Sequence, residues 1–202
     1  MKTIVGLLAF AALVCTAVAK AGEGKTMDAK TESAVIGGGC FWCMDAVFEH
    51  VSGVKSVTCG YAGGRAENPS YEEVCTGATG HAEVVRIEFD PAVVNYAQLL
   101  DIFWDAHDPT TLDRQGWDEG TQYRSIILFA DEAQRAAAEK SKAAAQAKSA
   151  DPIVTEIVPL KKFFSAEEYH QHYFDKNPTA GYCRVVIKPK VSKLQKAGVI
   201  GK

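Results

Sequence analysis

Two cysteines with the spacing Cys40-x-x-Cys43 are the residues of this sequence best suited to chemistry. They follow three glycines, 37–39, which come directly after the apolar, β-prone run 33–36. An amphipathic run begins at Met44, so the segment predicts a strand, a tight turn and a helix that starts at or near Cys40. The partial positive charge at a helix N-terminus lowers the pKa of a thiol, and the thiolate is the nucleophilic form. The glycines are expected to leave room beside this thiol for a substrate.

A lone cysteine is more often a buried structural residue, but two thiols on a glycine-rich turn favour redox chemistry or metal binding. The histidines offer no ligand set with the spacing of a metal site. His170 and His172 are two residues apart on a predicted helix, so their rings should point apart rather than share one ion. We therefore predict redox chemistry and no metal.

The composition is that of a globular protein of one domain, because 202 residues with 23% charged and 47% hydrophobic residues fit the ordinary range. The formal net charge is only −3, which indicates neither a nucleic-acid partner nor a membrane surface. Six cysteines in this length do not make a small disulfide-stabilised fold.

Export is predicted by the first nineteen residues, which have the three parts of a secretory signal peptide. Lys2 gives the positive start, 4–14 the apolar centre, and Ala17-Val18-Ala19 a small-residue site with cleavage expected after Ala19. The apolar centre is shorter than the roughly 20 residues that a spanning helix needs, which disfavours an uncleaved anchor. The mature protein is expected in the periplasm or outside the cell, where thiols need a dedicated reductant.

Polarity and periodicity divide the rest of the chain. Residues 20–32 are polar and aperiodic, as in a linker, and the chain is basic from Lys188 onward. We expect a single catalytic domain over residues 33–190 and a basic C-terminal tail over 191–202.

The expected elements mix strands and helices without a regular βαβ rhythm, which favours an α+β fold with a mixed central sheet flanked by helices. Asn95 and Asp131 each precede a glutamine by three residues and predict helix starts. A capping box at Ser165 predicts a helix that carries Tyr169, His170, His172 and Tyr173. Expected strands lie at 54–61, 83–89, 123–129, 154–158 and 183–187, and a short helix lies at 71–75. Residues 107–122 form a long polar loop of the kind that is usually functional or disordered.

Glu83 stands out in the strand that ends at Phe89. Val85, Ile87 and Phe89 face one side of this strand, and Glu83 is in register with them. Its carboxylate is therefore expected on the apolar side, where such a group is paired, at an end, or functional.

Gly39-Cys40-Phe41-Trp42 resembles the active-site motif of the A-type peptide methionine sulfoxide reductases. Four further segments resemble the same family in its order and spacing: Gly60-Tyr61-Ala62-Gly63-Gly64, Gly80-His81-Ala82-Glu83, His107-Asp108-Pro109 and Gly120-Thr121-Gln122-Tyr123-Arg124-Ser125. The resemblance extends from about Ser33 to Lys190. It implies an oxidoreductase that repairs oxidised proteins by reducing free and protein-bound methionine S-sulfoxide.

The resemblance implies that Cys40 is the nucleophile that attacks the sulfoxide sulfur. It also implies that Glu83 is the general acid that protonates the leaving oxygen. Burial of Glu83 would raise its pKa and keep that proton available. The plain alternative is an edge carboxylate paired with Arg124.

Other family roles fall on aromatic and acidic residues. Tyr71 and Tyr123 match the two tyrosines whose hydroxyls hold the sulfoxide oxygen, and Asp118 would orient substrate or a bound water. Phe41 and Trp42 would form the pocket for the S-methyl group, which admits one sulfoxide epimer, the S form by the family's habit. Each of these aromatic residues could instead belong to an ordinary core.

A second thiol must resolve the sulfenic acid left on Cys40. We favour Cys43, because a partner three residues away needs little loop closure, with Cys183 as the alternative. Cys59 and Cys75 lie in segments expected to be packed and buried. The sequence departs from many family members at Cys43, where they carry Gly, and at Trp117, where they carry Asn.

Two other functions remain open on the sequence: a thioredoxin-like disulfide oxidoreductase built on the Cys40–Cys43 motif, and a non-catalytic peptide-binding module. For the reductase, the resemblance implies no bound cofactor and reducing equivalents from a thioredoxin-like protein or a dithiol. The expected partners are this reductant and oxidised proteins, peptides or free methionine sulfoxide. We expect a monomer.

Overall fold

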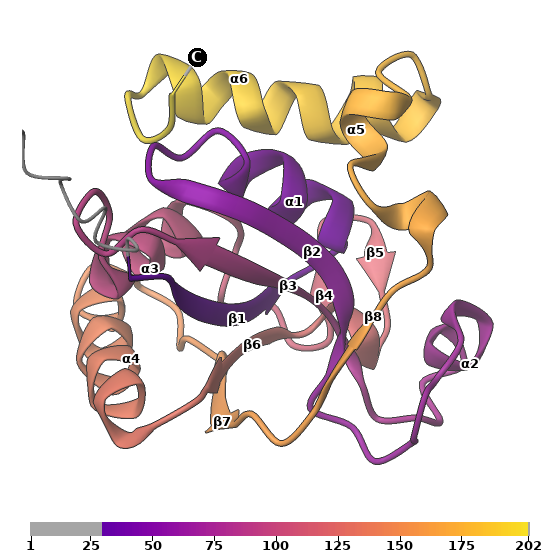
Figure 1. Ribbon diagram of the computed structural model, residues 1–202, viewed down its shortest axis with the longest axis horizontal. Helices are drawn as coiled ribbons and strands as arrows, with labels where there is room; N and C mark the ends of the chain where they lie inside the picture. The colour runs from indigo at the N-terminus through magenta and orange to yellow at the C-terminus, as the bar shows by residue number, and fades with distance from the viewer. Residues whose placement is uncertain (1–29, 202) are drawn as a thin grey trace, which may run out of the picture.

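The computed structural model describes residues 30–201, and a six-stranded sheet forms its centre (Figure 1). The strand order is β7-β6-β1-β3-β2-β8, and neighbouring strands are antiparallel except for the parallel pair β6 and β7. The strands are β1 (Glu32–Gly38), β2 (Val54–Ala62), β3 (Ala82–Phe89), β6 (Ser125–Phe129), β7 (Glu156–Pro159) and β8 (Phe163–Ser165). The α+β prediction with a mixed central sheet is therefore confirmed.

Helices form further layers on one face of this sheet. Helix α1 (Phe41–Phe48) packs on β2 and β3, and α6 (Lys188–Lys196) packs on α1 and α3 (Tyr96–Ala106), as Figure 1 shows. Helix α4 (Glu132–Gln146) lies against α3, β6 and β7. The shorter elements are α2 (Tyr71–Cys75), α5 (Tyr173–Lys176) and the hairpin of β4 (Arg114–Gln115) and β5 (Asp118–Glu119).

The two faces of the sheet bury different amounts of apolar surface. The larger cluster lies under α1, α3 and α6 and includes Phe48, Phe89 and Phe103. A smaller cluster on the opposite face includes Val35 and Leu128. Alternation along each strand feeds both clusters, because successive side chains point to opposite faces.

Local signals located most helix starts. Asn95 and Asp131 are N-caps that accept hydrogen bonds from the backbone of Gln98 and Gln134, as predicted. Strand β1 ends at Gly38, and Cys40, two residues later, is the N-cap of α1. This order confirms the strand–turn–helix prediction.

The predicted strand at 183–187 is wrong. Cys183–Ile187 is a π-helical turn that continues directly into α6. The β-branched run favours a strand locally, but the buried positions Cys183, Ile187, Val191 and Leu194 are spaced four, four and three residues apart. That helical period lets the segment bury one face against α1 and α3, and packing overrides propensity.

The predicted helix opening at Ser165 is also wrong. Ser165 is the last residue of β8, a 3-10 turn covers Glu168–His170, and α5 begins only at Tyr173. Residues 163–165 form hydrogen bonds with β2 as strand β8. Ser165 therefore belongs to the sheet and does not begin the helix that the capping pattern predicted.

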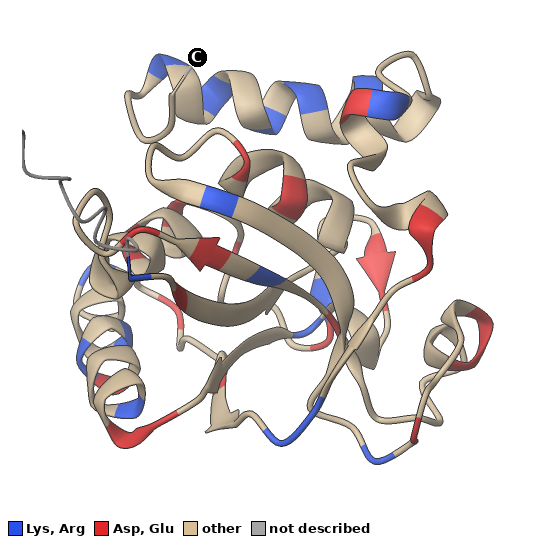
Figure 2. Cartoon of the chain, viewed as in Figure 1, with Lys and Arg blue, Asp and Glu red and all other residues tan. Residues whose placement is uncertain are grey.

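The folded domain begins earlier and ends later than the boundaries predicted from the sequence. β1 already begins at Glu32, and Val191, Leu194 and Ile200, within the segment expected to be a basic tail, are buried in the core. The predicted signal peptide and most of the predicted linker lie outside the described residues. Among residues 30–201, none of the helices is long and apolar enough to cross a membrane. Basic residues are prominent on α6, where the lysines are Lys188, Lys190, Lys193 and Lys196 (Figure 2).

Candidate active site

The glycines before Cys40 are required by neighbours of the turn rather than by space for a substrate. A Cβ on Gly37 would lie 2.5 Å from the backbone oxygen of Glu83, and one on Gly38 would lie 2.9 Å from the His107 ring. Gly39 has a φ of +93°, which favours glycine. The expectation that these glycines leave room for a substrate is therefore wrong, since they bring β1, β3 and the loop after α3 together.

Cys40 and Cys43 lie at the start of α1 as an interacting pair of buried thiols. Burial is the main cause that raises the pKa of Cys40, and Cys43 and Glu83 raise it further. The interaction with the Cys40 thiol lowers the pKa of Cys43 to about 7, with a contribution from the positive charge of Lys190. The predicted lowering of the Cys40 pKa is wrong, because burial outweighs the effect of the helix N-terminus. The low-pKa thiol is its partner.

Glu83 faces the apolar side of β3 as its register predicted, and only 1% of its surface is exposed. Its Oε2 accepts a 3.0 Å hydrogen bond from the backbone N–H of Phe41. Burial raises the pKa of Glu83 to about 8, although this hydrogen bond opposes the shift. The carboxyl group is therefore mostly protonated at neutral pH and can donate a proton. The alternative pairing with Arg124 is wrong, because Arg124 forms its ion pair with Glu156.

One cavity of about 170 Å³ brings Tyr71, Tyr123 and Asp118 together with Cys40 and Glu83, and Cys43 is not part of its lining. Its lining consists of Cys40, the two aromatic residues that follow it, three tyrosines and two acids: Cys40, Phe41, Trp42, Tyr71, Glu83, Asp118, Tyr123 and Tyr182. Burial raises the pKa of Tyr71 and Tyr123, so both hydroxyls keep their protons and can donate hydrogen bonds. The volume suits a small polar head group with a methyl substituent rather than a large ligand.

Aromatic packing fixes the walls of this cavity. Trp42 stacks on Tyr173 with ring centroids 3.7 Å apart, and the buried ring of His170 contacts those of Phe41 and Tyr71. The backbone N–H of Tyr71 donates to Glu167 over 2.9 Å. The predicted roles of Phe41, Trp42 and Tyr71 therefore rest on side chains with fixed positions.

Tyr182 is a site residue that the sequence analysis missed. Its hydroxyl donates a 2.6 Å hydrogen bond to Oδ2 of Asp118 and lies 3.7 Å from Sγ of Cys43. It connects the hairpin to the thiol pair, and burial raises its pKa, so it stays protonated. Its position directly before Cys183, a candidate resolving thiol, was the available signal. It was missed because the segment was predicted to be a strand of the sheet.

A second hollow of about 300 Å³ opens beside the thiols. It is lined by Cys40 and Cys43, by the hairpin around Trp117, and by Val185, Val186 and Lys190 of the C-terminal helical segment. The side chain of Trp117 is 82% exposed at its rim. Cys40 therefore lines both of these cavities, whereas Cys43 lines only the second.

Cys59, Cys75 and Cys183 differ in how deeply they are buried. Cys59 is buried as expected, whereas the expectation is wrong for Cys75, which is exposed on α2. Cys183 is buried near Cys43, and burial raises its pKa.

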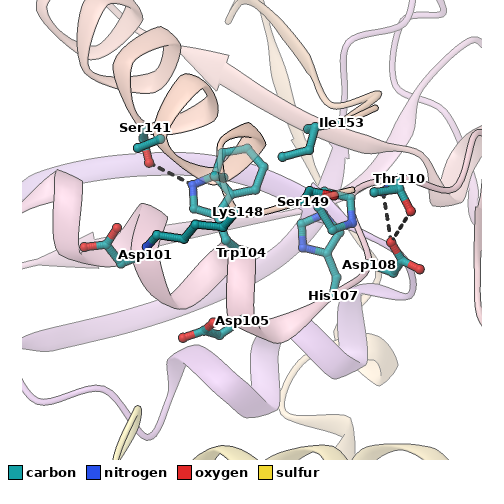
Figure 3. A pocket seen from close by; sticks show the side chains of 13 residues that line it. Asp101, Trp104, Asp105, His107, Asp108, Thr110, Ser141, Lys148, Ser149 and Ile153 are labelled. Atoms are coloured by element: carbon teal, nitrogen blue, oxygen red, sulfur yellow. Dashed lines mark hydrogen bonds between the residues drawn. The ribbon is translucent and has the colours of Figure 1, made fainter. Parts of the chain in front are cut away.

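A larger hollow of about 580 Å³ between α3 and α4 contains none of the cysteines (Figure 3). Its histidine, His107, is bonded through both ring nitrogens, to the backbone oxygen of Phe103 and to Oγ of Ser125. Burial lowers the pKa of His107 to about 4, so the ring is neutral and structural. The chemistry belongs to the smaller cavity.

A buried pair of thiols at a helix start, beside a protonated carboxyl group, defines a thiol-dependent oxidoreductase. The model of the peptide methionine sulfoxide reductase family matches residues 32–200. The chain belongs to that family.

Individual relatives agree with this assignment. The peptide methionine sulfoxide reductase MsrA of Nautilia profundicola is 59% identical over 163 residues, which are 81% of this chain and 94% of the relative. The crystal structure of Mxr1 from Saccharomyces cerevisiae in reduced form is 38% identical, with a TM-score of 0.73 over 79% of this chain and 92% of that one. Mxr1 has also been solved in complex with Trx2; that structure is 25% identical, with a TM-score of 0.53 over 74% of this chain and 91% of that one. Family membership favours the reductase over the thioredoxin-like enzyme and the non-catalytic module.

Proposed function

We propose that this chain is a peptide-methionine (S)-S-oxide reductase that acts on free and protein-bound methionine sulfoxide. The observation that carries the proposal is the placement of Cys40 and the protonated Glu83 in one cavity of about 170 Å³. Tyr71 and Tyr123 supply two hydroxyl donors in the same cavity. A nucleophile, a proton donor and hydrogen bonds for an oxygen are the groups that sulfoxide reduction needs.

The first step uses the thiol pair as a unit with one negative charge. The Cys40 proton passes to the Cys43 thiolate, and the Cys40 sulfur then attacks the sulfoxide sulfur. Glu83 gives its proton to the oxygen, and the resulting hydroxyl group moves from the substrate sulfur to the Cys40 sulfur. The bond between the two sulfurs breaks at the same time, so methionine leaves and Cys40 becomes a sulfenic acid. Sulfur of the substrate is reduced by two electrons and Cys40 is oxidised by two, while the charge ends on Glu83.

The orientation of the substrate follows from the walls of the cavity. Tyr71 and Tyr123 would donate to the sulfoxide oxygen, and Asp118 would hold substrate or water through its place beside Tyr182. Phe41 and Trp42 would receive the methyl group. Separate sites for oxygen and methyl leave one direction for the rest of the substrate, so only one epimer fits the attack on sulfur.

Cys43 would resolve the sulfenic acid. Its thiol attacks the Cys40 sulfur, a disulfide forms and water leaves. The interaction of the two thiols and the pKa of about 7 at Cys43 support this assignment. Cys183 lies close to Cys43 and is the alternative partner.

A thioredoxin-like protein would then reduce the disulfide by thiol–disulfide exchange. The complex of the relative Mxr1 with Trx2 supports this class of partner, as does the open hollow beside Cys43. No bound cofactor is needed in this cycle, because the electrons come from dithiols. We expect the enzyme to act as a monomer.

We propose that the protein is exported, with residues 1–19 as its signal peptide, and works in the periplasm or outside the cell. The test is the N-terminal sequence of protein recovered from the exported fraction. A mature chain that begins at Lys20 supports the proposal, and an intact Met1 in a cytoplasmic fraction contradicts it.

The function is tested with methionine S-sulfoxide, the R epimer and a dithiol. Wild type should release methionine from the S epimer, and Cys40→Ser should retain the fold by circular dichroism and release none. Cys59→Ser is the matched control, because that thiol is buried but does not line the cavity. Reduction by Cys40→Ser, or reduction of insulin disulfides without methionine release by wild type, would refute the proposal.

A further inference from the structure

A cluster of metal-ligating side chains lies outside the active site, where α1 meets α5. Asp45 and Glu49 are four residues apart and share one face of α1, and His172 directly precedes α5. One ligand atom from each of these three residues lies within 4.8 Å of the others. Two carboxylate oxygens and an imidazole nitrogen therefore converge from segments more than 120 residues apart in the chain.

Asp45 is the unusual member of this cluster. It is only 1% exposed, and among residues 30–201 neither of its carboxylate oxygens has a donor in good hydrogen-bond geometry, although the backbone of His172 is close enough to interact with it. A buried carboxyl group without a partner costs free energy, so such groups are normally paired or bound to an ion. The helix thus holds an acid in a place that suits a cation.

The other two members complete a donor set. Nδ1 of His172 is hydrogen-bonded to Oε1 of Glu49, so both atoms already point to one spot. His172 has a φ of +53°, an uncommon conformation for a residue other than glycine, which the packing around α5 maintains. A hollow of about 560 Å³ lined by Glu49, His172 and Asp175 gives an ion and its water ligand a route from solvent.

We propose that Asp45, Glu49 and His172 bind a divalent transition-metal ion of the Zn²⁺ type. Zn²⁺ accepts imidazole nitrogen and carboxylate oxygen at about 2.0–2.2 Å, with three protein ligands and a water. Binding would place the two carboxylate oxygens and the imidazole nitrogen on one ion, and no electron is transferred. The ion ties α1, which carries the thiols, to the segment that carries His170 of the cavity wall.

No metal was predicted from the spacing of the histidines, which considers them only relative to one another. His172 takes its proposed co-ligands from α1 rather than from His170, and that pairing exists only in the fold.

The test measures Zn²⁺ binding to the chelator-treated full chain by calorimetry. The Cys40→Ser/Cys43→Ser background removes the thiols, which themselves bind zinc. We expect one Zn²⁺ per chain and a melting temperature that rises when Zn²⁺ is added. Asp45→Asn and His172→Asn should each weaken binding by about tenfold or more, and asparagine tolerates the backbone at 172.

Glu139→Gln is the matched control, since it removes an exposed helical carboxylate of α4 and should leave binding unchanged. Circular dichroism verifies that each variant folds, and Glu49→Gln replaces Asp45→Asn if the latter unfolds. Zinc binding that is lost with the two cysteines, or that is equal in the Asp45, His172 and Glu139 variants, would overturn the proposal.

Discussion

The backbone N–H of Phe41 donates a 3.0 Å hydrogen bond to Oε2 of Glu83. This bond joins the residue after Cys40 to a carboxyl group 42 positions later in the chain. It uses one of the N–H groups that a helix start leaves without an intrahelical partner, and it fixes the direction of the acid. The nucleophile and the proton donor are thus positioned by the same turn of backbone.

Glu83→Gln should lower the first-turnover rate of sulfoxide reduction by about 10²- to 10⁴-fold, the usual range for a general acid. The amide keeps the size of the side chain and can still interact with the Phe41 N–H, but it has no acidic proton. The measurement is methionine release in rapid-quench experiments with excess enzyme. Glu88→Gln on the same strand is the control, and a Glu83→Gln rate within a few-fold of wild type would show that another group protonates the oxygen.

The pH dependence of that rate should have two limbs. Glu83 holds its proton up to a pKa of about 8, so the rate should fall as the pH rises above 8 and the acid ionises. The thiol pair loses its first proton near 7, so the rate should also fall as the pH drops below 7. Single-turnover rates between pH 5 and 10 measure both limbs. In Glu83→Gln the alkaline limb should disappear, and its persistence would assign it to another group.

The resolving thiol is tested by replacing each candidate. Cys43→Ser should release one methionine per chain and then stop, with the acid limb moved to higher pH because Cys43 no longer takes the Cys40 proton. Cys183→Ser should continue to cycle with a dithiol. Peptide mapping of wild type after one turnover without reductant should find Cys40 bonded to Cys43. Normal cycling of Cys43→Ser together with a Cys40–Cys183 disulfide would contradict the assignment.

Gly37→Ala should destabilise the fold by about 1–3 kcal/mol, the usual cost of forcing extra volume into a packed site. The added Cβ would lie 2.5 Å from the backbone oxygen of Glu83, which pairing within the sheet prevents from moving away. Urea unfolding of this variant and of Gly181→Ala makes the comparison, because Gly181 has no atom within 4 Å of its Cβ position. Equal stability of the two variants would mean that β1 can shift freely.

The sequence by itself determined the elements whose signals are local. Cys40 at a helix start, the caps at Asn95 and Asp131, and the inward register of Glu83 depend on a few neighbouring residues, and the structure has all of them. The α+β class followed from the order of such elements.

Only the tertiary structure decided the features that depend on distant neighbours. The pKa of Cys40 is raised rather than lowered because burial and the second thiol act on it. A local sequence pattern predicts neither the burial of Cys40 nor the position of the Cys43 thiol beside it. Val185 and its neighbours form helix rather than strand because the chain buries Cys183 and Ile187 against α1 and α3. Tyr182 reaches Asp118, and His172 reaches Glu49, across 64 and 123 positions of sequence. Contacts of that separation come from packing, which the local propensities of either segment do not encode.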